Sequence, residues 1–349
     1  MAGARRETIK LAPVVRALRA RPGLKIPFVT AGVPRNRLAA LATLFGLKPD
    51  TAIEAPDDLE AARRQLVPLI RDERPDLLLV HGRSAIALAA ALAAVDAGSA
   101  VAHVEAGLAL DGLRDANALA IGRLATLNFA PTGSARERLL AQGATPAGIH
   151  VTGSSGVDAL HMMIERLESD AGFAAAATLA PAGDGPLVLV TAERGETPLA
   201  AVTAVVQAMV METEARFLFV TDPAQHERLN IVFEGTPRVR IAGRLDYPAF
   251  VEAMRHAQVI LTDSSGIEEV APSIGVPVLV MRNSTDRPEG VAAGSAALVG
   301  SSATAIAAAA TRLLANPAAH AAMANVRSPY GDGLAAWRIA AIIREWIGA

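Results

Sequence analysis

The chain has 349 residues, of which 52% are hydrophobic and 3% aromatic, and its formal net charge is −2. Because this length exceeds what one hydrophobic core usually organises, we expect two domains of about 150 to 200 residues each. The small net charge argues against a polyanion-binding surface, and therefore against nucleic acid as the main partner.

The residue types that are missing exclude several classes of site. The chain has no cysteine, so it holds no disulfide, no thiolate metal site and no cysteine nucleophile, as suits a reducing, cytoplasmic location. Its seven histidines lack the short spacings of a zinc cluster. We therefore predict neither a metal nor a cofactor.

No segment of the sequence suits a membrane. The longest apolar run, Ala85 to Val95, ends at Asp96 and is well short of the roughly 20 residues that a spanning helix needs. Charged residues between Arg5 and Lys10 interrupt the first turns before any apolar block, unlike a secretory signal. The sequence therefore predicts no membrane partner.

Short apolar runs closed by turn residues alternate with helical stretches, a pattern typical of βαβ units and a mainly parallel sheet. In the first half the predicted strands are Ile26–Thr30, Leu77–His81, Ala100–Val104 and Leu127–Ala130. In the second half they are Leu187–Thr191, Phe217–Thr221, Val259–Thr262 and Pro277–Met281, with helices at Ala200–Glu214 and Ala303–Leu314. The pattern predicts an α/β fold.

The domain boundary is predicted from composition. A polar stretch rich in Ala, Gly and Pro, Asp170 to Gly185, cannot easily continue either core, so we place the change of domain near it. The predicted divisions are residues 1–165, residues 166–330 and a last helix within residues 331–349. Ligands of open α/β sheets bind at the carboxyl ends of the strands, so the loops after the strands are the expected site.

The first residues and the last helix of the sequence each lead to a prediction. The first residues pass directly into a helix-like run, Ile9 to Leu18, with no strand before it, so either the fold lacks that strand or the sequence starts late. The last helix, Gly333 to Ile347, carries Trp337, Trp346 and several isoleucines at helical spacing. We predict that these apolar side chains pack against the protein.

Two loops of the first half carry candidate chemistry. Gly3 to Lys10 is a small-residue turn with cations that opens a helix, and it would suit a phosphate, although terminal basic residues are often only solvated. Glu105 follows an apolar strand directly. A carboxylate at that position suits a general acid or a hydroxyl-binding group, or else it stabilises the start of a helix.

Two loops of the second half complete the candidates. Leu261 to Gly266 ends a strand in hydroxyl and glycine residues that open the next helix, which would present amides and the hydroxyls of Ser264 and Ser265 to a diphosphate. Val280 to Glu289 is a charged loop after a strand. It suits a binding loop, with a surface network of ion pairs as the alternative.

In the order and content of these loops the chain resembles the non-hydrolysing UDP-N-acetylglucosamine 2-epimerases over nearly its whole length. The segments TDSSGIEEVAPSIGVPVLVMRNSTDRPEGVAAG and SPYGDG are similar to hallmark sequences of that family, and HVEAGL and GARRETIKLAPVV add to the match. The resemblance implies a glycosyltransferase-B fold of two Rossmann-like domains, with the nucleotide sugar in the cleft between them. It also implies a last helix that crosses back to the first domain.

The resemblance assigns roles to individual residues. The residues implied to be catalytic are Lys10, Glu105 and Asp115. The residues implied to bind the UDP-sugar are Arg5, Phe250, Ser264, Ser265, Gly266, Glu269 and Arg282. Among these, Arg5 and Lys10 would face the phosphates and sugar, and Phe250 would stack on uracil unless it is a core residue.

The chain also departs from the family's pattern. Arg83 stands where the family has the acid of a His-Gly-Asp motif, and a permanent cation cannot shuttle a proton. Glu193 replaces a histidine near the diphosphate, which it would repel unless it is protonated or turned away. Val270 replaces a glutamate that grips the ribose, and the neighbouring Glu269 would substitute only if the helix rotates. The replaced positions are Arg83, Arg114, Ala118, Glu193 and Val270.

Alternative functions therefore remain open. The first is an epimerase that interconverts UDP-N-acetylglucosamine and UDP-N-acetylmannosamine, with Glu105 and either Asp115 or Glu193 transferring protons. The second is a non-catalytic paralogue that binds a sugar nucleotide and acts as the partner of an active epimerase. The third is a UDP-sugar hydrolase or glycosyltransferase on the same fold. The implied partners are a UDP-sugar and a second subunit, in a homodimer or in a heterodimer with an active paralogue.

Overall fold

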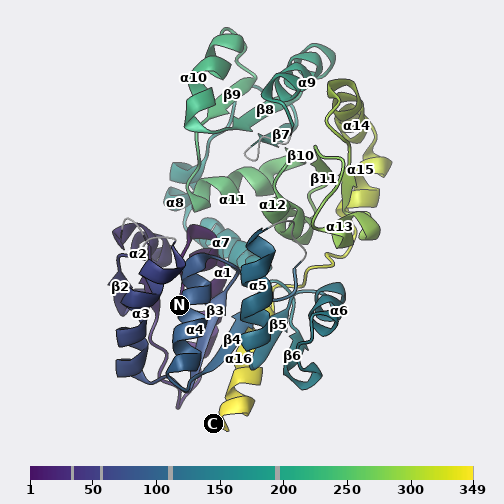
Figure 1. Ribbon diagram of the computed structural model, residues 1–349. Coiled ribbons are helices and arrows are strands. Elements are labelled where there is room, and N and C mark those ends of the chain that lie inside the picture. Colours follow the sequence, from purple (N-terminus) through teal and green to yellow (C-terminus); the bar gives the residue numbers. More distant parts are fainter. Residues whose placement is uncertain (33–34, 56–57, 109–112, 193–196, 349) are drawn as a thin grey trace. The chain divides into compact units, whose positions relative to one another are not determined.

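The computed structural model describes residues 1–32, 35–55, 58–108, 113–192 and 197–348, without the side chains of residues 35, 36 and 113–115 (Figure 1). The chain divides into two compact units. Unit 1 comprises Met1–Met162 and Tyr330–Ala349, and unit 2 comprises Met163–Pro329.

Unit 1 is built on parallel strands. β1 (Val29–Ala31) pairs with β2 (Thr51–Ile53), and β3 (Leu77–His81), β4 (Ala100–Val104), β5 (Leu127–Ala130) and β6 (Ile149–Val151) form a four-stranded sheet in that order. The predicted bounds of β3, β4 and β5 are confirmed, because short, mainly apolar runs mark the strands of a parallel sheet. β2 and β6 were not predicted, since each has only three residues and neither is buried throughout.

Short extended segments and helices complete unit 1. Ala2 forms a parallel bridge with Thr30, and its N–H donates to Val29 O at 3.0 Å. The helices are α1 (Arg5–Arg19), α2 (Arg35–Thr43), α3 (Leu59–Glu73), α4 (Ala85–Asp96), α5 (Leu113–Leu124), α6 (Gly133–Ala141), α7 (Ser155–Ser169, which continues into unit 2) and α16 (Ala335–Ile347), with a 3₁₀ turn at Pro146–Gly148. Most of the alanine-rich α4 is buried against α3 and the strands, since alanine permits close approach of backbones.

The last helix, α16, belongs to unit 1. Asp158 of α7 accepts hydrogen bonds from the first amides of α16, Ala335 N at 3.2 Å and Ala336 N at 2.8 Å. Ile339 and Ile343 are buried, so the predicted packing holds for them. It is wrong for the tryptophans, of which Trp337 is 60% and Trp346 41% exposed, because they lie on the outer face of the helix.

We expect Asp158→Ala to lower the free energy of unfolding of unit 1 by about 1–3 kcal/mol, because two buried helix amides lose their acceptor. Both tryptophans of the chain lie on α16, so urea unfolding followed by their fluorescence reports on this unit. The matched control is Asp332→Ala, which removes an ion pair to Arg338 in which both side chains are 36% exposed. Its expected cost is below about 1 kcal/mol, and equal losses in the two variants would contradict the prediction.

Unit 2 is a single parallel sheet of six strands in the order β12-β11-β10-β7-β8-β9. The strands are β7 (Leu187–Thr191), β8 (Arg216–Val220), β9 (Val239–Ala242), β10 (Ala257–Thr262), β11 (Val278–Val280) and β12 (Ala296–Leu298). β7 confirms its predicted bounds, and β8, β10 and β11 lie within two residues of theirs. The core consists of their aliphatic and phenylalanine side chains packed against α9 and α14.

The helices of unit 2 lie between and after its strands, except α8, which precedes β7. They are α8 (Ala171–Ala177), α9 (Leu199–Glu212), α10 (Pro223–Val232), α11 (Tyr247–His256), α12 (Ser265–Val270), α13 (Pro288–Ala293), α14 (Ala303–Ala315) and α15 (Pro317–Ala324), with a 3₁₀ turn at Ala271–Ile274. The stretch near which we placed the change of domain, Asp170 to Gly185, contains α8, which Asp170 caps by accepting from Phe173 N at 2.9 Å.

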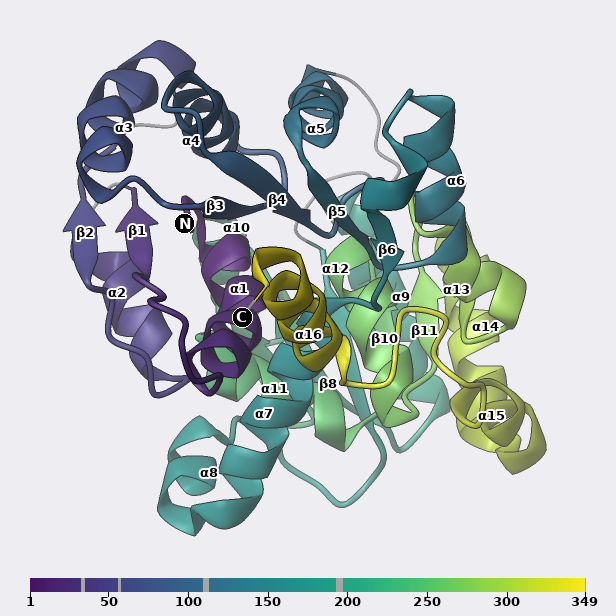
Figure 2. The same ribbon diagram turned by 90° about the horizontal axis from the view of Figure 1, so that it is seen from below.

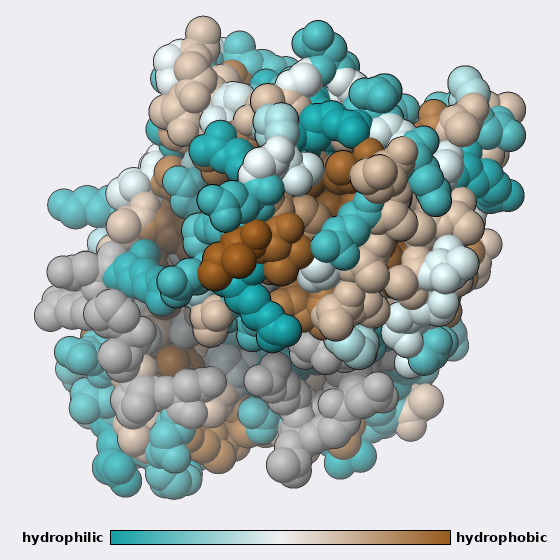
Figure 3. All heavy atoms as spheres, turned by 90° about the horizontal axis from the view of Figure 1, so that it is seen from above, coloured by the Kyte–Doolittle hydropathy of each residue, from teal (hydrophilic) through white to brown (hydrophobic). Residues whose placement is uncertain are grey.

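The surface mixes polar and apolar residues. In the face seen in Figure 3, hydrophobic side chains lie in small groups between hydrophilic ones. Met211 and Ile231 are exposed, and isolated exposed apolar residues are common in folded proteins. Within the described ranges, no helix combines the length and apolar character required to span a bilayer.

Candidate functional site

The strongest cluster of unit 1 surrounds Glu105, at the edge of the sheet where the strands end. Glu105 follows β4 directly and is 6% exposed. Its backbone has φ = 58°, a left-handed conformation that is uncommon for residues other than glycine. Such a conformation persists where surrounding contacts over-determine it, and these sites are frequently functional.

The contacts of Glu105 come from three distant parts of the chain. Its Oε2 forms an ion pair with Lys10 Nζ of α1 and lies 3.2 Å from His81 Nε2 at the end of β3. Its Oε1 accepts from Ser154 Oγ at 2.6 Å and from Gly156 N at 3.3 Å, in the segment that opens α7. Both carboxylate oxygens are therefore engaged by donors.

These contacts decide the charge of Glu105. Burial alone would raise the pKa of this carboxyl, but the nearby Lys10 ammonium and His81 outweigh burial and hold the pKa well below its ordinary value. Glu105 is therefore ionised at neutral pH. In this state it fixes the positions of Lys10 and His81.

A second buried carboxyl lies next to His81. Glu7 of α1 is 5% exposed, and its Oε2 accepts from Gly3 N at 2.7 Å. Burial raises the pKa of Glu7, and His81 opposes that rise. His103 of β4 completes the group through a hydrogen bond between its Nε2 and Gly82 O at 2.8 Å, and burial lowers the pKa of His103 to about 4.

The Glu105 ion pair predicts a loss of stability in acid. A carboxyl with a depressed folded pKa stabilises the fold fully above its unfolded pKa, about 4.5, and loses that contribution as the pH falls further. We therefore expect the difference in unfolding free energy between the native protein and Glu105→Gln to shrink below about pH 4.5. Urea unfolding followed by tryptophan fluorescence at several pH values measures it, and groups common to both proteins cancel. A difference that stays constant from neutral pH into acid would contradict the prediction.

In unit 2, hydroxyl groups gather at the carboxyl ends of β7 and β10. The hydroxyls of Thr191 and Thr262 are 2.7 Å apart, and Thr262 Oγ1 also accepts from Ser264 N at 2.9 Å. Ser264 and Ser265 are buried, and the Ser264 side chain does not cap α12. The turn from Thr262 to Gly266 is thereby held by its own threonine.

A buried ionic cluster stands beside that turn. Arg287 Nε lies 3.2 Å from Glu269 Oε2, and Arg282 Nη1 lies 3.3 Å from Asp286 Oδ1 and 4.0 Å from Glu268 Oε1. Burial raises the pKa of Glu268, and Asp286 adds to the rise. These carboxyls and guanidinium groups come from α12 and from the loop after β11, so the predicted charged loop is a buried network and not a surface one.

The structure brings several predicted site residues together. Lys10 and Glu105 form one ion pair in unit 1, and Ser264, Ser265, Gly266, Glu269 and Arg282 lie at one edge of the unit 2 sheet. Arg5 lies half-buried in the first turn of α1, and Phe250 lies half-buried in α11. The side chain of Asp115 and the whole of Glu193 lie outside the described residues.

Two features bear on the binding of ribose. Glu269 is fully buried and paired with Arg287, whereas the neighbouring Val270 is half-buried.

Sequence reasoning missed four side chains of the unit 1 cluster: Glu7, His81, His103 and Ser154. The position of His81 as the last residue of a predicted strand was an available signal. The contact of Ser154 with Glu105 spans 49 positions in sequence and had none.

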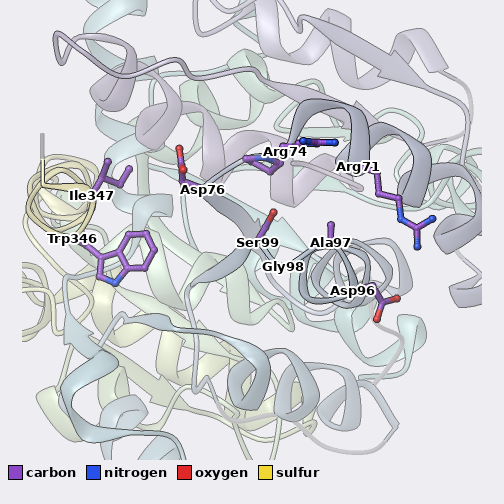
Figure 4. Close-up of a pocket in the computed structure, with 10 residues that line it drawn as sticks. Arg71, Arg74, Asp76, Asp96, Ala97, Gly98, Ser99, Trp346 and Ile347 are labelled. Carbon is purple, nitrogen blue, oxygen red and sulfur yellow. The ribbon is translucent and has the colours of Figure 1, made fainter.

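A cavity of unit 1 lies away from the Glu105 cluster. It has a volume of about 840 Å³ and is bordered by Asp76 and Ser99, which precede β3 and β4, and by Trp346 of α16 (Figure 4). It is thus at the amino ends of strands whose carboxyl ends carry His81 and Glu105. Among the residues that the structure describes, no group of His, Cys, Asp and Glu side chains could hold a metal ion.

The chain is similar to known proteins over nearly its whole length. The family model for UDP-N-acetylglucosamine 2-epimerase matches residues 16–344. The UDP-N-acetylglucosamine 2-epimerase of Salmonella typhimurium is 33% identical over 365 residues, covering 99% of this chain and 97% of that protein.

Solved structures are similar as well. The structure of S. aureus MnaA with UDP matches with a TM-score of 0.87 at 30% identity, covering 99% of this chain and 95% of that one. The UDP-GlcNAc 2-epimerase of Neisseria meningitidis bound to UDP-GlcNAc matches with a TM-score of 0.87 at 28% identity, covering 99% and 98%. These likenesses confirm the predicted α/β fold of two Rossmann-like domains of the glycosyltransferase-B type. The chain belongs to the UDP-N-acetylglucosamine 2-epimerase family.

Proposed function

We propose that this protein is a UDP-N-acetylglucosamine 2-epimerase, which interconverts UDP-N-acetylglucosamine and UDP-N-acetylmannosamine. The observation that carries the proposal is the buried cluster of Lys10, Glu105 and His81 at the carboxyl ends of β3 and β4. The names of full-length relatives and the ligands of similar structures support the substrate class.

The reaction requires a proton acceptor and a means of holding the departing diphosphate. The proton at C2 of the sugar leaves as the bond between C1 and the UDP oxygen breaks, which gives a glycal and UDP. Return of a proton to the opposite face of C2, with reformation of the C1–O bond, gives the other epimer. Proton transfer by a positioned group is worth about 10²- to 10⁴-fold in rate.

Glu105 and Lys10 together suit these two requirements, Glu105 as the proton acceptor and Lys10 as the cation that stabilises the departing diphosphate. While Lys10 pairs with Glu105, the carboxylate is ionised but weakly basic. When negative charge develops on the departing diphosphate, the Lys10 ammonium is drawn towards it, and the pKa of Glu105 then rises. Asp115, at the start of α5, is proposed as the second proton-transfer group.

In unit 2 we assign the diphosphate to the turn after β10. The hydroxyls of Ser264 and Ser265 and the amide of Gly266 are the donors, and Arg282 supplies positive charge beside them. Phe250 on α11 is assigned to the uracil ring. Arg5 is assigned to the phosphate and sugar from the first turn of α1.

Subunit association and location belong to the same proposal. We propose a cytoplasmic protein that forms a homodimer, with a heterodimer with an active paralogue as the alternative. Light scattering after size-exclusion chromatography of the purified chain tests the homodimer, and a monomer at micromolar concentration would contradict it.

The experiment that tests the activity is incubation with UDP-N-acetylglucosamine in deuterium oxide, followed by proton NMR. Epimerisation through a glycal predicts deuterium at C2 together with the manno epimer. Free N-acetylglucosamine and UDP would indicate a hydrolase instead. If neither deuterium incorporation nor the manno epimer exceeds the level in a protein-free control, the epimerase proposal is wrong and a non-catalytic role is favoured.

A further inference from the structure

The turn after β6 connects Glu105 to a distant part of unit 1. Within this turn Ser154 is 0% exposed, and its Oγ donates to Glu105 Oε1 at 2.6 Å. The same Oγ accepts from Gly156 N at 3.0 Å, so its one proton is directed at the carboxylate. A residue with no exposed surface does not touch a substrate. Any influence of Ser154 on the chemistry therefore passes through Glu105.

The backbone of Ser154 is held by residues 330–338, which we call the strap. Ser154 N donates to Tyr330 O at 2.7 Å, and Tyr330 is itself 0% exposed. Gly331 lies so close that a Cβ added to it would stand 3.2 Å from Gly153 Cα and 3.4 Å from Ser154 N. Gly331 also has φ = 128°, which residues with a Cβ rarely adopt. The strap thus contacts Ser154 main chain to main chain.

Further contacts of the strap fix the chain on both sides of Ser154. Arg338 donates from Nη1 to Thr152 O at 3.1 Å and forms two hydrogen bonds with Asp332, at 2.8 and 2.7 Å. A bidentate pair of this kind adds geometric definition. On the other side, Asp158 accepts from the first amides of α16. The strap therefore contacts the chain before, at and after the donor to Glu105.

The strap also leads into α16, which packs beside α1, the helix that carries Lys10. Figure 2 shows these two helices side by side, with α4 and α5 on the other side of the strands. Lys10 and Ser154 bind different oxygens of Glu105, Oε2 and Oε1. Because both oxygens lie in one plane with their carbon, a donor fixed on Oε1 limits the directions in which Oε2 points.

We propose that Ser154 is a positioning residue for Glu105, and that the strap supports the reaction by holding Ser154 in place. The inference rests on the proposed epimerase function, in which Glu105 accepts the proton from C2. Without a donor on Oε1, the carboxylate turns about its side-chain bonds and Oε2 is aligned for a smaller fraction of the time. A displacement of a reacting group by about 1 Å can cost about 100-fold in rate.

The first test is Ser154→Ala, which removes the hydroxyl and leaves the strap in place. We expect kcat for epimerisation to fall by about 10- to 100-fold with KM within about threefold, since Ser154 acts on Glu105 and not on the substrate. The acidic limb of the kcat profile should move to higher pH, because a carboxylate that loses a donor is protonated more easily. A merely structural role would not move this limb.

This reading of the pH profile depends on the groups around Glu105 staying the same. In the described part of the chain, the titratable groups beside it are Lys10 of α1, His81 of β3 and His103 of β4, and Glu7 of α1 acts on His81. Ser154→Ala changes none of them. An acidic limb that stays in place while kcat falls would contradict the proposal.

The matched control is Ser155→Ala. Ser155 is as buried as Ser154, but its Oγ lies 3.4 Å from the same Oε1 of Glu105, at the limit of a hydrogen bond. We expect its effect on kcat to stay below about threefold, with the acidic limb in place. Equal losses in the two variants would show that the short bond from Ser154 has no special role.

The strap is tested by Gly331→Ala, whose added methyl group presses on Gly153 and on the amide of Ser154. We expect kcat to fall by about tenfold in a protein with native tryptophan fluorescence. The control is Gly143→Ala, since Gly143 also has a positive φ, 86°, but its Cβ would meet nothing within 4 Å. Its rate should stay within about twofold of the native one. If Gly331→Ala does not fold, Arg338→Met, which removes the donor to Thr152 O, replaces it.

The double variant Ser154→Ala/Gly331→Ala shows whether the strap acts through Ser154. If it does, the loss of kcat is smaller than the product of the two single losses, because the second change has no positioned hydroxyl left to displace. Arg338→Met combined with Ser154→Ala gives the same comparison. Single losses that multiply in the double variant would exclude this role of the strap.

A stability measurement separates failure of this inference from failure of the epimerase proposal. The contribution of Glu105 to unfolding, measured against Glu105→Gln, declines as the pH falls below about 4.5. In the Ser154→Ala background this decline should be smaller, because the folded pKa of Glu105 then lies closer to its unfolded value. A smaller decline without any turnover would count against the epimerase function alone. A decline of equal size in both backgrounds would overturn the positioning role, whatever the activity.

Discussion

Replacement of Glu105 by Gln is expected to lower the rate of epimerisation by about 10²- to 10⁴-fold, the range for loss of a positioned proton-transfer group. Gln has the same shape but no charge, so Lys10 and His81 lose the group that fixes them. The measurement is the initial rate of deuterium incorporation at C2, with UDP-N-acetylmannosamine formation as the second readout.

The control for this variant is Glu137→Gln, in unit 1, where the carboxylate pairs with Arg136 at 2.7 Å but its side chain is 68% exposed. It should leave the rate within about twofold, since an exposed pair contributes little. A Glu105→Gln protein that is folded by its tryptophan fluorescence and retains more than about half of the native rate would exclude Glu105 from the chemistry.

A double-mutant cycle measures the coupling free energy between Lys10 and Glu105. Lys10→Met removes the ammonium and leaves Glu105 buried beside His81. If the two groups act as a pair, the loss of stability in the double variant Lys10→Met/Glu105→Gln is smaller than the sum of the single losses. If the loss of stability in the double variant equals the sum of the two single losses, the two side chains are not energetically coupled.

Replacement of Glu269 by Gln is expected to destabilise unit 2 by about 3–5 kcal/mol, because Arg287 would keep its charge in a buried site without its ion-pair partner on α12. Both groups are almost inaccessible, with Glu269 0% and Arg287 6% exposed. Tryptophan fluorescence does not report on unit 2, so hydrogen exchange of β10 in rising urea is the measurement.

The matched control for Glu269 is Glu214→Gln, also in unit 2. Glu214 lies 3.5 Å from Arg238, but its side chain is 91% exposed, so the expected loss is below about 1 kcal/mol. A Glu269→Gln protein as stable as this control would show that Arg287 is stabilised by its other contacts, such as Asp286 at 3.6 Å.

The strands illustrate what an unaligned sequence predicts well. β3, β4, β5 and β7 are mainly apolar runs of four or five residues closed by turn residues, and their bounds follow from that pattern alone. β12 has only three residues, and its solvent exposure rises along the strand. Such a strand depends on the neighbour with which it pairs, so local pattern does not mark it.

In the candidate site, too, some features were predictable from the sequence and others were not. Glu105 and the turn from Thr262 to Gly266 were predicted because residues that follow a strand are placed at the carboxyl edge of the sheet. The outward position of Trp337 and the burial of Glu269 were not predictable, since helical periodicity does not say which face of a helix the rest of the protein covers.

The sequence by itself therefore determined the α/β class, most of the central strands and the family, because apolar runs and motif order are local properties of the chain. Only the tertiary structure decided the charge of Glu105, since its donors come from residues 10, 81, 154 and 156. Burial and strand pairing are properties of distant segments brought together, and composition along the chain does not record them.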